Sequence, residues 1–363
     1  MKQLHIISCV EDLPRFRWES IVQLTNFRKY NLSDKARVIV FLPSYKEIEG
    51  FSREWDGIIK LFPEVKFFFY RDEKNKITDL MINYNYIPIH RLCSLERHFL
   101  KYPELEQDAI LYIDSDVIFT KQPNFNDYQE DNINYLSDTA SYLNYTYLQG
   151  KENDVIPEKL EAYKTINPIA KLAKMCDVHI DSIKDNNNNT GGAQYLLKNV
   201  NAKFFSRCID TCLLIRIYLQ QINQEFFPGK TRQEKEDKGF QSFCADMWAI
   251  QWELWRQNMP SKTPKWMDFA WSTDEVKRLE DVCMLHNAGI VSDDSIRTTD
   301  SSNGKSTGTK SIPSFWKEKY KTKNVFNHIE DIQKIVDNED SRKYCTSVYA
   351  KEIIDTYNTI KTQ

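Results

Sequence analysis

The sequence is poor in glycine and lacks the motifs in which glycine residues bind phosphate. Only 10 of its 363 residues are Gly, and neither GxGxxG nor GxxxxGKS/T occurs. A dinucleotide site or a P-loop needs such glycines for close approach of the backbone to phosphate, so neither is expected. A large excess of one charge is also missing. The formal net charge of −3 gives no general attraction to nucleic acid.

Two further absences concern membranes and redox state. No apolar run reaches the roughly 18 residues of a membrane helix. The N-terminal run 4–10 has no cleavage site of small residues and is interpreted as a strand, not a signal peptide. The eight cysteines include no CxxC pair, and most lie in apolar segments. We therefore expect reduced thiols, no membrane span and a cytoplasmic protein, in the host cytoplasm if the source is viral.

The first 120 residues alternate between apolar runs and amphipathic segments. The run 109–113 is apolar throughout, which predicts a strand buried on both faces. In residues 51–62, apolar side chains recur at helical spacing. Strands separated by helices in this way are typical of a parallel sheet covered on both sides. Strands are predicted at 4–10, 37–42, 65–70 and 109–113, and helices at 14–30, 51–62 and 87–102.

The remaining residues give a mixed pattern. The sequence therefore predicts an α/β protein with a Rossmann-like, mostly parallel sheet, continued by a mixed second half and a helical tail over residues 313–363. Strands are predicted at 134–137, 192–199 and 281–285, helices at 157–175, 202–221 and 243–257, and polar or charged loops at 185–190, 226–239 and 293–310.

Two carboxylates, Asp114 and Asp116, directly follow the predicted strand 109–113. Residues i and i+2 of a strand point the same way, and parallel sheets bind ligands at the carboxyl ends of their strands. Carboxylates this close repel each other, and a divalent cation holds both ionised. Bound Mg²⁺ or Mn²⁺ would neutralise a departing diphosphate as a Lewis acid. The simpler alternative is a strand that ends in a polar turn.

The peptide Asp114-Ser115-Asp116 resembles the DxD motif of glycosyltransferases with the GT-A fold. Three later peptides agree with this resemblance. They are NTGGAQ at 189–194, similar to the glycine-containing strand beneath the donor sugar; CADMW at 244–248, similar to the acidic helix start that faces the reacting carbon; and LHNAG at 285–289, similar to the late metal-binding histidine. The sequence resembles uncharacterised viral and bacterial members that contain the strings GGAQYL, CADMW and HNAG.

The resemblance implies a metal-dependent hexosyl- or pentosyltransferase that uses a nucleoside-diphosphate sugar, with a UDP-sugar favoured. Residues 1–120 would form the nucleotide-sugar-binding half, and 121–312 the acceptor-side half of the same domain. Mn²⁺, or Mg²⁺, would be held by Asp114, Asp116 and His286, and the imidazole favours Mn²⁺. The residues predicted to bind the donor are Asp114, Ser115, Gly191, Gly192, Gln194, Lys310, His5, Ser8 and Arg91, the last three from their positions alone.

Asp246 is the predicted catalytic residue. It would act as general base on an acceptor hydroxyl if the reaction inverts. A carboxylate in the first turn of a helix also has a sufficient structural reason in the helix dipole. Residues 293–310 are predicted to form a mobile loop that closes over the donor, with Lys310, or less favourably Lys305, on the diphosphate. The alternative is a solvated loop.

Other interpretations stay open. An apolar run before DxD is also the nucleophile motif of haloacid-dehalogenase-like phosphatases, with Asp114 as nucleophile, although those enzymes open with the motif. An inactive GT-A-shaped binding module is a second alternative. The acceptor could be a glycan, a protein or a modified DNA base. Aromatic and basic residues interleave at 316–323, which suits DNA, but a solvated helix face is favoured.

Overall fold

The computed structural model describes residues 2–42, 51–71, 86–125, 128–229, 231–288, 296–299, 306–310 and 312–362. The chain divides into two compact units, each built from several segments. Unit 1 comprises Met1–Leu4, Asn75–Leu111 and Asn126–Pro264. Unit 2 comprises His5–Lys74, Tyr112–Phe125 and Lys265–Gln363. The predicted boundary near residue 120 stays a prediction.

The principal sheet has seven strands in the order β3-β2-β1-β4-β7-β6-β8. Strands β1 and β2 pair in parallel, as do β2 and β3, whereas β6 runs antiparallel to β7. The predicted α/β class, with a mostly parallel sheet that becomes mixed, is therefore confirmed. The strands are β1 Leu4–Glu11, β2 Ala36–Leu42, β3 Lys66–Arg71, β4 Ala109–Tyr112, β6 Asn134–Asp138, β7 Gly191–Lys198 and β8 Ser261–Lys262.

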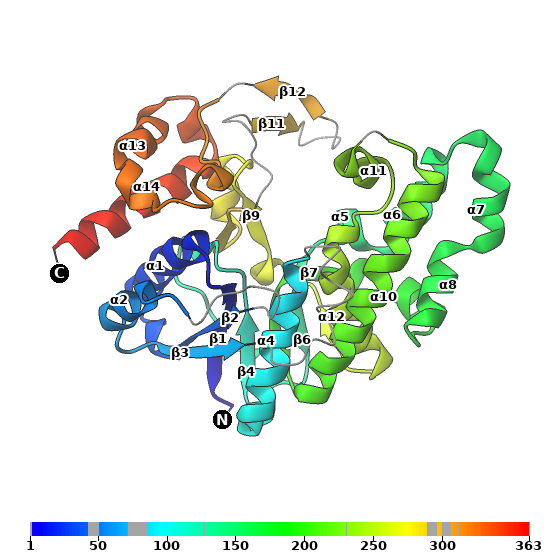
Figure 1. The fold of residues 1–363 in the computed structure, drawn as a ribbon, viewed down its shortest axis with the longest axis horizontal. Helices are drawn as coiled ribbons and strands as arrows, with labels where there is room; N and C mark the ends of the chain where they lie inside the picture. The colour runs from blue at the N-terminus through cyan, green and yellow to red at the C-terminus, as the bar shows by residue number, and fades with distance from the viewer. Residues whose placement is uncertain are drawn as a thin grey trace. The chain divides into compact units, whose positions relative to one another are not determined.

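Unit 2 combines the first strands with the C-terminal helices (Figure 1). Trp18 and Val22 of α1 pack in one core with Leu285, Phe315 and Tyr349, so the C-terminal helices pack against α1. The helices are α1 Pro14–Lys29, α2 Glu54–Leu61, α13 Ile329–Asp337 and α14 Cys345–Lys361, with 3₁₀ helices at Ser33–Lys35, Lys265–Met267, Val276–Glu280, Lys317–Tyr320, Val325–His328 and Ser341–Lys343. A second sheet has the order β5 (Val117–Phe119), β10 (Met284–His286) and β9 (Phe269–Trp271).

Unit 1 is built around the long helix α10, which runs beside α4 (Figure 1). Rings of Phe99 and Phe205 meet there at 5.0 Å. None of the helices in the described ranges has the length and apolar character needed to cross a membrane. The helices are α4 Pro88–Lys101, α5 Ala140–Leu143, α6 Tyr145–Gly150, α7 Leu160–Ile166, α8 Pro168–Met175, α9 Ile180–Asp185, α10 Ala202–Phe226, α11 Arg232–Lys238 and α12 Ala245–Arg256, with 3₁₀ helices at Pro103–Gln107, Lys151–Asp154, Pro157–Lys159, Asn187–Asn189 and Ser242–Cys244.

Two predictions about helices are wrong. The predicted helix 157–175 is broken at Asn167, which has a left-handed φ of 45° and precedes Pro168. The residue before a proline avoids the helical region, so the Asn-Pro pair ends one helix and starts another. The predicted charged loop 226–239 contains α11, which begins with a capping box between Thr231 and Glu234.

The predicted loops need two further corrections. Residues 185–190 include a short 3₁₀ helix at Asn187–Asn189. The predicted loop 293–310 contains the antiparallel strands β11 Ile296–Thr299 and β12 Ser306–Lys310. Threonine is frequent in both strands, and its β-branched side chain favours extended backbone. The other residues of this segment lie outside the described part of the chain, so its predicted closure over a donor stays untested.

Candidate active site

Asp114, Asp116 and His286 come together in unit 2 and are called the metal triad here. The two aspartates lie between β4 and β5, and His286 ends β10, which pairs with β5. Nε2 of His286 lies 3.4 Å from Oδ2 of Asp114 and 3.3 Å from Oδ1 of Asp116. The three ligand atoms lie within 4.8 Å of one another. The residues that the sequence singled out as metal ligands are therefore neighbours.

These distances suit a single divalent cation. Bonds of about 2.1 Å from one ion place neighbouring ligand atoms roughly 3 Å apart, close to the separations found. Two carboxylates and one imidazole also form a donor set that accommodates Mn²⁺. Asp116 and His286 are buried, whereas Asp114 is partly exposed. One side of the metal triad is thus accessible to a ligand from outside the protein.

Aromatic rings fix the orientation of the imidazole. The ring of His286 stacks on Trp271, with centroids 5.5 Å apart and an interplanar angle of 24°. Phe269 meets the same imidazole edge-on at 5.2 Å. Both rings come from β9, which pairs with β10 in parallel. A histidine held in this way keeps its Nε2 directed at the two carboxylates, which a metal ligand requires.

Lys317, which the sequence analysis did not select, contacts the metal triad. Its ammonium group donates to Oδ2 of Asp116, while His286 lies at the other carboxylate oxygen. Burial opposes ionisation of Asp116, but Lys317 and His286 outweigh it and hold the pKa of this carboxyl well below its usual range. Asp116 is therefore an anion at neutral pH, as a metal ligand has to be.

Ser115 and Ser8, both predicted to bind the donor, make hydrogen bonds inside unit 2. The Ser115 hydroxyl donates to Oε2 of Glu19 at 2.7 Å. The Ser8 hydroxyl donates to Oε1 of Gln23, also at 2.7 Å. Both serines are buried. Their hydroxyl groups thus bond to side chains of α1. Contact of either serine with a donor stays a prediction.

Asp246 belongs to a buried polar cluster in unit 1. It lies in the first turn of α12, and its Oδ2 is 2.5 Å from Nη2 of Arg91 on α4. The hydroxyl of Tyr86 lies 3.1 Å from Oδ1 and accepts the backbone N–H of Asp246 at 3.1 Å. Burial, followed by the charge of Asp246, raises the pKa of Tyr86 well above its usual value. The predicted catalytic residue is thus paired with Arg91, a predicted donor-binding residue.

Gly191 and Gly192 begin β7, and packing against backbone excludes a side chain at Gly191. A Cβ on Gly191 would lie 2.5 Å from the carbonyl oxygen of Ser137, and one on Gly192 would lie 2.6 Å from Cε of Met247 in α12. Gln194, two residues further on, is fully buried. The sequence analysis attributed the glycines to close approach of a sugar. For Gly191 the structure supplies a different reason, and contact of these residues with a donor stays a prediction.

The solved structures that are similar to this chain include two glycosyltransferases. The first is WbbM, described as a bifunctional glycosyltransferase, with 9% identity over 79% of this chain and a TM-score of 0.35. The chain covers only 46% of WbbM. The second is the galactosyltransferase LgtC in complex with donor and acceptor sugar analogues, with 12% identity, 78% of this chain and 87% of that chain covered, and a TM-score of 0.40. Both proteins are glycosyltransferases.

No model of a known protein family matches the sequence, and no curated protein does. Because both TM-scores lie below 0.5, any statement about activity has to rest on the residues themselves. Those residues form two sets, the metal triad with Lys317 in unit 2 and the Arg91–Asp246 pair in unit 1.

The other predicted donor residues lie apart or are not described. Nδ1 of His5 accepts a hydrogen bond from Nε of Arg37 at 3.2 Å. His5 lies three residues before Ser8 on β1, about 10 Å along a strand, so the two are not neighbours. Lys310 ends β12, but its side chain lies outside the described part of the structure, as does Lys305.

Asn287 is a second residue that sequence analysis missed. Its backbone N–H donates to the carbonyl oxygen of Asp116 at 3.0 Å, which ties β10 to the Asp114–Asp116 connection. Its side chain is buried, and neither Oδ1 nor Nδ2 has a hydrogen-bond partner among the described residues. Buried amides normally have partners, so this side chain is an exception among the described residues next to the metal triad. The available signal was an asparagine directly after the predicted ligand.

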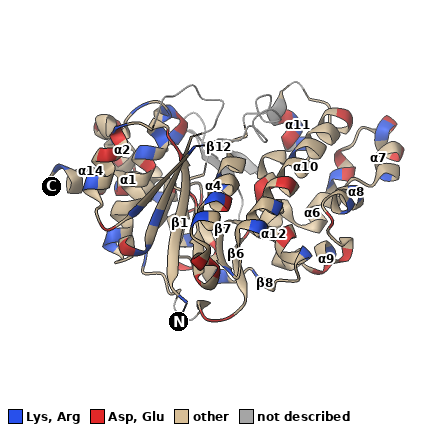
Figure 2. Ribbon diagram, turned by 60° about the horizontal axis from the view of Figure 1, so that its bottom comes forward, with Lys and Arg blue, Asp and Glu red and all other residues tan. Residues whose placement is uncertain are grey.

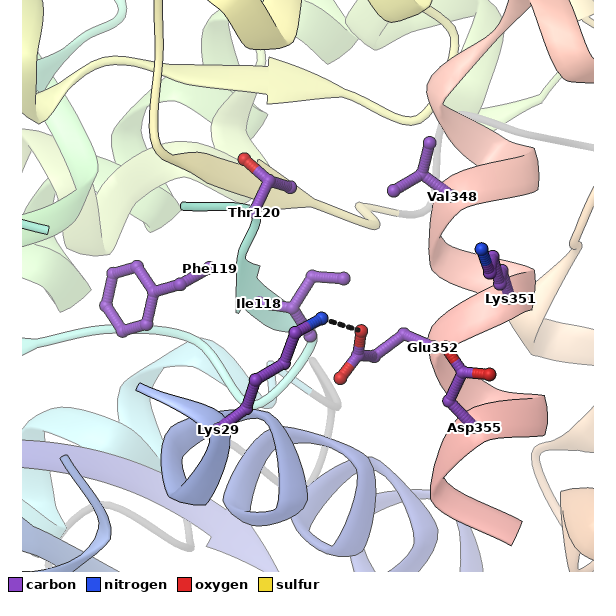
Figure 3. A pocket seen from close by; sticks show the side chains of 8 residues that line it. All are labelled: Lys29, Ile118, Phe119, Thr120, Val348, Lys351, Glu352 and Asp355. Carbon is purple, nitrogen blue, oxygen red and sulfur yellow. Dashed lines mark ion pairs between the residues drawn. The ribbon is translucent and has the colours of Figure 1, made fainter. Parts of the chain in front are cut away.

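A cavity of about 180 Å³ lies in unit 2 at the far end of β5 from Asp116 (Figure 3). Its charged side chains come from α1 and α14. Lys29 and Glu352 form an ion pair across it at 3.6 Å. Lys351 and Asp355 add one charge of each sign. Since these charges offset one another, the lining does not select a ligand of either sign, and we assign no function to this cavity.

Proposed function

We propose that the chain is a metal-dependent glycosyltransferase that binds the diphosphate of a nucleoside-diphosphate sugar at the metal triad. The observation that carries the proposal is the convergence of Asp114, Asp116 and His286 to separations that fit one divalent cation. The DxD-like order of the aspartates, directly after a buried strand, supports it. Mn²⁺ is the proposed ion, and a UDP-sugar the proposed donor.

The residues of unit 2 would bind and neutralise the diphosphate. A bound divalent ion acts as a Lewis acid that stabilises negative charge on the leaving diphosphate. Asp114, Asp116 and His286 would hold that ion, and Lys317 would offer an ammonium group to the phosphate oxygens once it leaves Asp116. Both contributions favour the state in which charge has moved onto the leaving group, so they accelerate transfer and do more than bind the donor.

The proposed catalytic residue belongs to the Arg91–Asp246 pair of unit 1. We propose Asp246 as the catalytic carboxylate. In an inverting reaction it would take the proton of the acceptor hydroxyl as that oxygen bonds to the anomeric carbon and the bond to the diphosphate breaks. In a retaining reaction it would stabilise positive charge on the sugar. Arg91 pairs with this carboxylate and fixes its direction through the 2.5 Å contact.

The contacts of the segment at 316–323, which suggested a DNA acceptor, do not favour one. Lys317 is bonded to Asp116, and Lys321 pairs with Glu318 at 3.8 Å. Tyr320 is buried and stacks on Phe315 with centroids 5.5 Å apart. In unit 1, Figure 2 shows basic and acidic residues interspersed along α10 and α7. We therefore propose an uncharged acceptor such as a glycan or a protein hydroxyl.

The proposal is tested by thermal unfolding with a panel of nucleoside-diphosphate sugars, with and without Mn²⁺. Specific binding raises the melting temperature by mass action. We expect one sugar nucleotide to stabilise the wild type only when Mn²⁺ is present, and Asp116→Asn to abolish that effect. Metal-independent stabilisation by the nucleotide would contradict the proposal. Hydrolysis of a simple phosphate ester, with no binding of any nucleotide, would favour the phosphatase alternative.

A further inference from the structure

Helix α1 carries three buried polar side chains on one face. Glu19, Gln23 and Asn26 follow one another at spacings of four and three residues, which places them on one side of a helix. All three are at most 1% exposed. A helix normally buries apolar side chains, and a buried amide is costly unless it is fully hydrogen-bonded. The hydrogen-bond partners of these three side chains therefore show which part of the chain this polar face stabilises.

Gln23 binds the backbone on both sides of Asp116. Its Nε2 donates to the carbonyl oxygen of Asp114 at 2.7 Å and to that of Val117 at 3.1 Å. Its Oε1 accepts from the Ser8 hydroxyl of β1 at 2.7 Å. Every polar atom of the Gln23 side chain is thus used, and two of its three bonds go to the connection that carries the metal ligands.

Glu19 holds the middle of the same connection. Its Oε2 accepts from the hydroxyl of Ser115, which lies between the two aspartates. Gln23 and Glu19 therefore fix residues 114–117 at three points from one helix. This matters because the carboxylates of Asp114 and Asp116 repel each other when both are ionised, and a connection without these bonds could turn them apart.

We infer that Gln23 is a positioning residue for the metal ligands, and that α1 sets the directions of Asp114 and Asp116 before any metal binds. The inference rests on the proposed function. Hydrogen bonds that orient metal ligands from behind typically change metal affinity by about 10–100-fold.

Asn26 provides a matched control on the same helix. Its Nδ2 donates to the carbonyl oxygen of Phe119 at 2.9 Å, and its Oδ1 accepts the N–H of Phe119 at 2.8 Å. A third bond joins Nδ2 to Oε1 of Glu352 at 3.1 Å, beside the cavity of Figure 3. Asn26 thus makes the same kind of backbone bonds as Gln23, but at the end of β5 remote from Asp116.

The experiment compares Gln23→Met with Asn26→Leu in the full chain. Mn²⁺ affinity is measured by the electron paramagnetic resonance signal of free Mn²⁺, and stability by thermal unfolding without metal. Both variants should melt at a lower temperature. Gln23→Met should also bind Mn²⁺ at least about tenfold more weakly and change the spectrum of the bound ion. Asn26→Leu should retain the affinity and spectrum of the wild type.

Equal Mn²⁺ affinity in Gln23→Met and wild type would overturn the inference, and so would an equal loss in both variants. If Gln23→Met does not fold, Ser8→Ala replaces it, because it removes only the hydroxyl that donates to Gln23. It should weaken Mn²⁺ binding by a smaller factor, and unchanged affinity with an unchanged spectrum would overturn the inference. If the wild type binds no Mn²⁺, the proposed function fails first.

Discussion

At the scale of single residues, Lys317 occupies a carboxylate, that of Asp116, which is also the proposed ligand of the metal. Lys317 donates to its Oδ2, on the carboxylate whose Oδ1 faces His286. An ammonium group and a divalent cation cannot both neutralise this carboxylate at short range, because they repel each other. Binding of a metal should therefore release Lys317, which then becomes available to an anionic ligand.

This competition predicts effects of opposite sign for Lys317→Met. Without nucleotide, the variant should bind Mn²⁺ more tightly than wild type, by about tenfold, which corresponds to about 1.4 kcal/mol. With Mn²⁺ saturating, it should bind a nucleoside diphosphate more weakly, because a cation has been removed. Calorimetric titrations measure both affinities.

Lys321→Met is the matched control for this prediction. Lys321 lies in the same segment but is 56% exposed and pairs only with Glu318 among the described residues. Its removal should leave Mn²⁺ affinity unchanged, since exposed ion pairs contribute little. Weaker Mn²⁺ binding by Lys317→Met would show that Lys317 supports the metal triad and does not compete for it.

Asp246→Asn should impair turnover far more than donor binding. The amide keeps the size of the side chain and can still accept a hydrogen bond, but it cannot take a proton. Loss of a general base typically lowers the rate by about 10²–10⁴-fold. Steady-state kinetics should show that loss in kcat. Tyr86→Phe, which removes the hydroxyl near Oδ1 but keeps the Arg91 pair, should retain most of the activity. Normal turnover of the Asn variant would leave Asp246 a helix-start residue.

At the scale of elements, the break between α7 and α8 depends on one asparagine. Asn167 ends α7 with φ at 45°, and its side chain caps α8 by accepting from the N–H of Ala170 at 3.3 Å. Pro168 follows as the first residue of α8, where its missing N–H costs nothing. Asn167 therefore has two roles. Its left-handed backbone ends α7, and its side chain caps α8.

Two substitutions should separate the contribution of the cap from that of the backbone conformation. Asn167→Ala loses the cap and also places an unfavourable side chain at positive φ, so it should lower the free energy of unfolding by about 1–3 kcal/mol. Asn167→Gly loses the cap but adopts positive φ freely, and should cost only a few tenths of a kcal/mol. Urea denaturation measures both. Equal costs for the two variants would mean that the backbone conformation at Asn167 is not strained.

At the scale of the whole molecule, stability depends on pH through buried carboxyl groups. Burial raises the pKa of Glu19 to about 7, against the opposing charges of Arg15 and Lys317. The folded protein thus keeps a proton on Glu19 that the unfolded chain, with the ordinary pKa of 4.5, releases earlier. This contribution to stability is fully present below about pH 4.5 and is lost as pH rises through about 7.

Glu19→Gln should remove that dependence, because glutamine does not ionise. In metal-free protein, the stability of the variant relative to wild type should increase between about pH 5 and pH 8. Urea denaturation at both pH values measures it. Glu54→Gln, at a carboxylate whose side chain is 70% exposed, controls for the loss of a negative charge. A difference between Glu19→Gln and wild type that stays constant with pH would contradict the assignment.

The sequence by itself determined most of the elements and the three members of the metal triad. A buried strand or helix has apolar residues at a regular spacing along the sequence. The apolar strands β1, β2 and β4 and the helices between them could therefore be predicted. Asp114 and Asp116 were recognisable because two carboxylates directly after a buried strand are unusual. His286 was recognisable only through the resemblance. The cap at Thr231 and the Asn167-Pro168 break also have local signals, which the prediction overlooked.

Only the tertiary structure decided which distant side chains meet. Lys317 contacts Asp116, and no periodicity marks one lysine of a basic segment above another. The polar face of α1 is also visible only in the fold, because Glu19, Gln23 and Asn26 resemble an exposed helix face in sequence, yet all three are buried. Their hydrogen-bond partners lie on β5, the connection before it, β1 and α14. Such pairings depend on how strands are ordered in a sheet, which local residue patterns do not encode.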